Sequence, residues 1–171
     1  FDVPEGVEEA FSSIRSQEEV YQLTAYGEVP GESLDERLSV DIFLVDDLMI
    51  NGQQVLGLSG GLPGAAGVHG NGRNGLVFHT ADLGHDNAHV AHLLAHELGH
   101  YIGLRHTTEI VFGAGRDIEQ RYSDAIGVVD PLEDTPVCEG IQTEPQECPD
   151  LDNLMFPAAP RQGENREPIL T

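Results

Sequence analysis

The sequence predicts one domain of the α/β (α+β) class, built from a mixed sheet and one long helix. Residues 38–45 and 75–80 are rich in β-branched and aromatic residues, and the first of these segments alternates in polarity, which is typical of strands. Residues 86–102 carry apolar side chains at helical spacing. A chain of 171 residues, 39% of them hydrophobic, is long enough for one sizeable core. We therefore expect residues 1–171 to form a single domain.

Local signals predict the elements around these segments. An early helix follows Pro4 and Glu5, which suit a helix start, because four apolar residues recur there at helical spacing: Val7, Ala10, Phe11 and Ile14. Residues 27–32 are typical of a turn. Residues 56–75 contain too much glycine for a helix, and a plain surface loop is one interpretation of them.

The long helix is expected to begin near Asp86 or Asn87, since either side chain can cap exposed amide groups, and to end at about Ile102. Its apolar residues should pack against the sheet: Val90, Leu93, Leu94, Leu98 and Ile102. We interpret His89 and His92 as polar residues on its first turns or at the rim of a cleft. An auxiliary contact with metal or substrate is the alternative.

The same helix carries histidines at the spacing of metal ligands. His96 and His100 are four residues apart on one helical face, so both imidazoles can reach one Zn²⁺ at roughly 2.0 to 2.1 Å. Glu97 lies at the rim of that face, where it can act as general base. Gly103 permits a sharp turn that returns His106 as third ligand. Three protein ligands leave one position open, as in catalytic zinc sites.

This extended motif resembles the signature of the metzincin zinc endopeptidases. The family implies a Met-turn, whose methionine underlies the metal, and Met155 within residues 153–157 fits that role. The long interval between His106 and Met155, with its segments 130–138 and 148–150, resembles the pappalysin-like branch and its bacterial secreted members. The resemblance covers residues 38–157. It implies a twisted mixed sheet, an active-site helix and an edge strand, within residues 56–75, that could pair with extended substrate.

Several features depart from the family pattern. Some metzincins place a tyrosine two residues after the methionine, but Pro157 stands there, so no tyrosine switch is expected. The residue after the third histidine is Thr107, unlike the Ser, Asp or Glu of better-known groups. We see neither a clear first strand nor the closing C-terminal helix of a metzincin domain. Either the fold is minimal or the chain lacks these segments.

The two cysteines, Cys138 and Cys148, are ten residues apart in a segment rich in Pro and Glu. We expect a disulfide, which would stabilise this region by roughly 2 to 3 kcal/mol in the chain-entropy model. A pair of zinc thiolates is the alternative, but no nearby Cys or His completes a structural set. An oxidised pair indicates a secreted or extracytoplasmic location.

Composition excludes some partners. The 30 acidic residues outnumber the 8 basic ones, giving a net charge of −22, so little could neutralise nucleic-acid phosphates or bind an anionic membrane surface. No apolar run approaches the ~20 residues of a membrane span. The charge suits a solvated surface, or else a cleft that attracts basic substrate side chains. Six aspartates could supply oxygen ligands for Ca²⁺, without a calcium-loop spacing: Asp117, Asp124, Asp130, Asp134, Asp150 and Asp152.

Together these observations predict a secreted bacterial zinc metalloendopeptidase that acts on proteins or peptides. Zinc would polarise the scissile carbonyl and lower the pKa of its bound water toward roughly 7. Glu97 would accept the water proton and deliver it to the leaving amine. A propeptide or inhibitor could occupy the cleft. The alternative is a repurposed, non-catalytic zinc-containing binding module, against which the presence of Glu97 argues.

Overall fold

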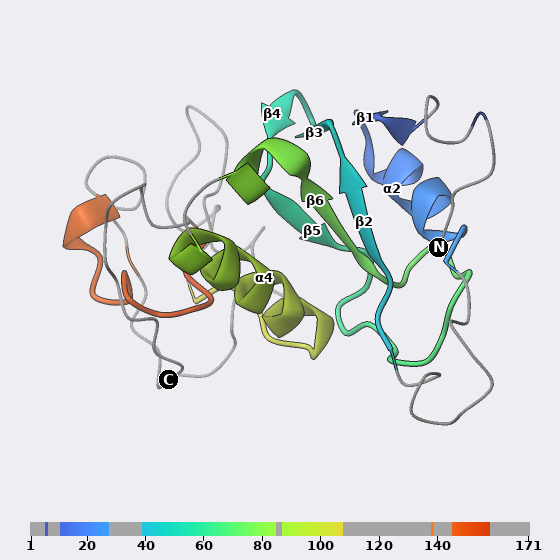
Figure 1. Ribbon diagram of the computed structural model, residues 1–171. Coiled ribbons are helices and arrows are strands. Elements are labelled where there is room, and N and C mark those ends of the chain that lie inside the picture. The colour runs from blue at the N-terminus through green and yellow to red at the C-terminus, as the bar shows by residue number, and fades with distance from the viewer. Residues whose placement is uncertain are drawn as a thin grey trace. The chain divides into compact units, whose positions relative to one another are not determined.

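A computed structural model describes residue 6 and residues 11–27, 39–84, 87–107, 138 and 145–157 (Figure 1). The chain divides into two compact units, Phe1–Gly103 and Leu104–Thr171, which we describe separately. The expectation of a single domain stays a prediction. Among the described residues, no helix combines the length and apolarity needed to cross a bilayer. The first unit contains β1 (Ser13–Ile14), α2 (Gln17–Thr24), β2 (Ile42–Val45), β3 (Asp47–Ile50), β4 (Gln53–Gln54), β5 (Gly57–Ser59), β6 (Leu76–His79), η1 (Thr80–Gly84) and α4 (Asn87–Tyr101).

The described strands form two three-stranded sheets with mixed pairing. In the order β2-β6-β5, β2 runs parallel to β6 and β5 runs antiparallel to it. In the order β1-β3-β4, β1 runs parallel to β3, and β3 runs antiparallel to β4. The α+β class is confirmed, and the predicted strand segments 38–45 and 75–80 contain β2 and β6. The chain passes from one sheet to the other at Asp46, whose N–H donates to the Ser12 carbonyl at 2.8 Å.

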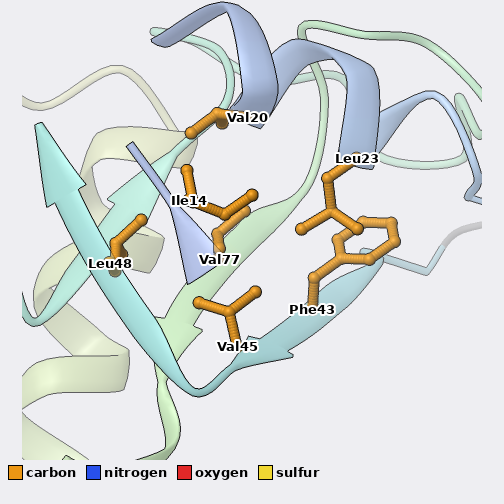
Figure 2. Close-up of a cluster of buried hydrophobic side chains, with 7 residues drawn as sticks. All are labelled: Ile14, Val20, Leu23, Phe43, Val45, Leu48 and Val77. Carbon is orange, nitrogen blue, oxygen red and sulfur yellow. The ribbon is translucent and has the colours of Figure 1, made fainter. Parts of the chain in front are cut away.

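Strand β6 contributes to two apolar clusters because successive side chains of a strand point to opposite faces. Val77 packs with residues of α2 and three other strands in a cluster drawn in Figure 2: Ile14, Val20, Leu23, Phe43, Val45, Leu48 and Val77. Leu76 and Phe78 pack instead with Leu93 and Tyr101 of α4. Helices α2 and α4 therefore cover opposite faces of the β2-β6-β5 sheet (Figure 1).

The N-terminal prediction was wrong for Ile14, which lies in β1 and is fully buried. Parallel pairing with Leu48 of β3 holds it there, so tertiary pairing overrides the helical spacing. The other predicted helix residues that precede position 11 lie outside the described residues. Helix α2 was not predicted, although Ser16 is its N-cap and accepts the Glu19 N–H at 3.2 Å, as the Ser-x-x-Glu pattern indicates.

The hairpin β3–β4 was also not predicted. Its turn is Asn51-Gly52, and both residues have positive φ, at 53° and 78°. That conformation belongs to the two-residue hairpin turn for which Asn-Gly is the preferred sequence. The Asn-Gly pair was therefore a usable signal.

The Gly-rich stretch contains an edge strand. Residues 57–59 form β5, which pairs with β6 on one side and is the last strand in its sheet. A plain surface loop is thus the wrong interpretation of residues 57–59. The predicted turn at 27–32 lies outside the described residues beyond Gly27.

In the second unit, Cys138 and Cys148 form a disulfide whose Cα atoms are 5.1 Å apart. Both are buried, with Phe156 and with Leu151 packed alongside. The disulfide prediction is confirmed. Because the sulfurs are bonded to each other, they are not a pair of zinc thiolates. The short helix η2 (Pro145–Glu147) precedes Cys148.

Candidate metal centre

Helix α4, Asn87–Tyr101, presents the first two predicted ligands side by side, and its bounds agree with the predicted helix. His96 is buried and His100 half-buried, with their ring centroids 4.8 Å apart in an edge-to-face arrangement. The ligand atoms of His96, His100 and His106 all lie within 4.8 Å of one another. Nitrogens bound to one tetrahedral zinc at roughly 2.0 to 2.1 Å would be about 3.3 Å apart. Three neutral imidazoles at this separation therefore fit a zinc ion.

Gly103 ends the zinc helix in the way the motif predicts. Its φ is 105°, in the left-handed region that favours glycine. Its N–H donates to the His100 carbonyl at 2.9 Å, so the residue closes the last turn of the helix. A side chain at this position would be strained whatever space surrounds it.

The buried face of α4 differs from the predicted apolar face. Leu93 is buried and Leu94 is partly buried in the cluster against β6. Leu98 and Ile102, however, are 45% and 67% exposed, so the prediction that they pack against the sheet was wrong. At about 100° per residue they lie roughly 140° and 180° around the axis from Leu93. The positions that face the sheet are occupied by Glu97 and the other motif residues.

Glu97 is buried against the sheet and not on an open rim, with only 6% of its surface exposed. Burial raises the pKa of its carboxyl from 4.5 to about 8 in the metal-free protein, and the backbone N–H of Ser59, which donates to the carboxylate, opposes this rise. Gly57 of the same strand lies next to the Glu97 side chain, so no Cβ could be added there without meeting it.

The C-terminal end of α4 is attached to the Gly-rich stretch. The Tyr101 carbonyl accepts the Gly64 N–H at 2.7 Å, and the Tyr101 ring occupies the place where a Gly64 side chain would begin. Asn74 braces the same stretch, accepting the Ala65 N–H at 2.7 Å and donating to the Ala65 carbonyl at 2.9 Å. Sequence reasoning missed Tyr101 and Asn74, because neither belongs to a motif.

In the second unit, residues around Met155 form a tight turn. The Met155 N–H donates to Oδ1 of Asn153 at 2.8 Å, and the Phe156 N–H donates to the Asn153 carbonyl at 3.0 Å. Met155 is 2% exposed, and its carbonyl accepts the N–H of Thr107, the residue after His106, at 3.2 Å. The predicted turn is therefore hydrogen-bonded to the chain beside the third histidine.

The remaining predicted residues are placed less decisively. His89 and His92 lie on the first turns of α4, and any contact with metal or substrate stays a prediction. Asp152 is exposed, and the first four predicted calcium ligands lie outside the described residues. Asp150 accepts a hydrogen bond from the Thr107 hydroxyl. Calcium binding stays a prediction.

Comparison with known protein families matched residues 28–155 to Peptidase M43, described as "Pregnancy-associated plasma protein-A". This match covers well over half of the chain and includes all three histidines, Glu97 and Met155. A search among curated proteins and another among solved structures each found no match. The metzincin-like α+β fold and the family agree, and the chain belongs to the peptidase M43, or pappalysin, family of metallopeptidases.

Proposed function

We propose that this chain is a zinc-dependent endopeptidase that hydrolyses peptide bonds in proteins or peptides. The observation that carries the proposal is the convergence of the His96, His100 and His106 ligand atoms within 4.8 Å. Membership of a metallopeptidase family supports it. The first two histidines come from one helical face and the third follows the turn at Gly103.

The three histidines would hold zinc, and Met155 would underlie the site. Zinc, when bound, polarises the scissile carbonyl and acidifies the attacking water. Glu97 follows His96 directly and has a carboxylate free of any metal-ligand role in this proposal. Its carboxylate oxygen accepts the proton of the attacking water and then donates it to the nitrogen of the leaving amine. The burial of Glu97 keeps bulk water from competing for that proton.

The proposed substrate is an extended peptide. Strand β5 is the edge of its sheet, and backbone groups on an edge can pair with an incoming strand. Backbone pairing would position the peptide largely independently of its side chains. An inhibitor or propeptide in the same place stays a prediction.

We also propose that the protein works outside the cytoplasm, because disulfides persist in oxidising compartments. The high negative charge is compatible with a solvated surface. Bacterial origin stays a prediction.

The direct test measures zinc content and cleavage of a denatured protein substrate, with and without a chelator. We expect one zinc per chain and cleavage that stops on chelation and returns when zinc is restored. Full binding of zinc without any cleavage would support the alternative, a repurposed binding module. Cleavage that persists in the thoroughly chelated protein would refute the zinc mechanism.

A further inference from the structure

Gly57 of β5 leaves room for the side chain of Glu97. A Cβ at position 57 would lie 2.8 Å from Cγ of Glu97 and 2.9 Å from the ring of Phe78. Carbon atoms in favourable contact are about 3.5 to 4.0 Å apart. Gly57 is absent from the residues with positive φ, so its backbone does not itself require glycine. Glycine is needed here for space.

Ser59, two residues further along β5, holds the carboxylate. The Gly60 N–H donates to the Gly75 carbonyl at 2.9 Å, and the His79 N–H donates to the Leu56 carbonyl at 3.0 Å. Alternate residues of an antiparallel strand direct their backbone groups to the same side, so positions 56 and 60 face β6. Ser59 is out of phase with them and directs its N–H away from β6. The Glu97 carboxylate accepts this N–H.

We propose that Gly57 and Ser59 are positioning residues for Glu97, the first by leaving space for its side chain and the second by holding its carboxylate with a backbone N–H. This inference rests on the proposed role of Glu97 as general base. A general base acts only within hydrogen-bond reach of the proton that it accepts, and a displacement of about 1 Å can cost roughly a hundredfold in rate. A side chain at position 57 displaces Glu97 by such an amount.

The first experiment compares Gly57→Ala with Gly84→Ala in the zinc-loaded full chain. Gly84 is a matched control because a Cβ there would meet nothing within 4 Å, and its φ is not positive. For Gly57→Ala we expect kcat to fall about tenfold or more, with KM within about twofold and zinc content unchanged. The acidic limb of its kcat–pH profile should also shift, because this limb reports the base. Gly84→Ala should match the wild type.

The second experiment removes the N–H with Ser59→Pro. Because the Ser59 N–H points away from β6, proline there removes no hydrogen bond of the sheet. We expect kcat to fall about tenfold while zinc stays bound, and the conservative Ser59→Ala, which keeps the N–H, to recover most of that loss. The alanine variant also removes the hydroxyl that donates to the Gly61 carbonyl at 2.6 Å, so the comparison separates side chain from backbone.

Unchanged kcat in both Gly57→Ala and Ser59→Pro would overturn the inference. So would a parallel loss of zinc, KM and folding in both variants, since that would make the two positions structural. If only Gly57→Ala fails to fold, the comparison of Ser59→Pro with Ser59→Ala decides. An inactive wild type, or a fully active Glu97→Gln, would instead refute the proposed function itself.

Discussion

The hydroxyl of Thr107 donates a hydrogen bond of 2.5 Å to Oδ2 of Asp150, and both residues are buried. Thr107 follows the third histidine, and Asp150 follows the disulfide cysteine Cys148 by two residues. The bond therefore connects the chain next to His106 with the segment that leads into the turn at Met155.

Asp150→Asn should destabilise the protein, because a hydrogen bond to a charged group typically contributes about 1.5 to 3 kcal/mol. We expect a lower free energy of unfolding in urea and weaker zinc binding, since the chain beside His106 is less well held. Asp152→Asn is the matched control, because Asp152 is exposed. Equal stabilities of the two variants would contradict this account.

Glu97→Gln should reduce kcat by about 10² to 10⁴, the usual contribution of a general base. The amide is almost the same size as the carboxyl but accepts no proton at neutral pH. Zinc content, measured by atomic emission, should not change, because Glu97 is not a proposed ligand. A variant that cleaves substrate at the wild-type rate would remove Glu97 from the mechanism.

His106→Ala should weaken zinc binding and activity together, because it removes one of three ligand atoms that lie within 4.8 Å of one another. Competition with a chromogenic chelator gives the change in affinity. His69→Ala serves as the control, since His69 lies elsewhere, paired with Asp41 at 2.9 Å. Wild-type zinc affinity in His106→Ala would exclude it from the ligand set.

The metal-free protein should lose stability as pH rises. Burial raises the pKa of Glu97 from 4.5 to about 8, so the folded state binds the extra proton between these values. The contribution is fully present below about pH 4.5 and is lost as pH rises through 8. Urea unfolding of chelated wild type and Glu97→Gln at several pH values measures it as a difference. Identical pH dependence in both proteins would contradict the prediction.

Replacing both Cys138 and Cys148 with serine should lower the free energy of unfolding by roughly 2 to 3 kcal/mol, the value expected for closing a short loop. The same measurement on the wild type with and without reductant provides an independent check. Activity under non-denaturing conditions should survive if the disulfide only stabilises the second unit. Resistance of the stability to both changes would show that the segment is held by other contacts.

The sequence predicted the parts of the molecule that depend on local spacing. His96, His100 and Gly103 are specified by helical periodicity and by the need for a left-handed residue, so the helix and its end were predictable. The strands β2 and β6 were predictable from their composition. Cys138 and Cys148 needed only a chain short enough to close.

The features that were missed depend on contacts between distant segments. Ile14 has helical spacing with its neighbours, yet its pairing with Leu48 places it in a strand. The apolar residues Leu98 and Ile102 suggested a buried face, whereas α4 turns Glu97 toward β5. The role of Gly57 appears only when the strand and helix are placed together, because its backbone is ordinary.

The position of β6 between β2 and β5 has a consequence for the order of folding. In chain order β6 is the last of the three strands, so β2 and β5 have no partner in that sheet until residue 79 has left the ribosome. Helix α4 follows within a few residues, and its apolar face packs on Leu76 and Phe78 of the same strand. The sheet and the histidine-bearing helix should therefore form in one cooperative step during synthesis, and the amides of β6 should be among the slowest to exchange with solvent.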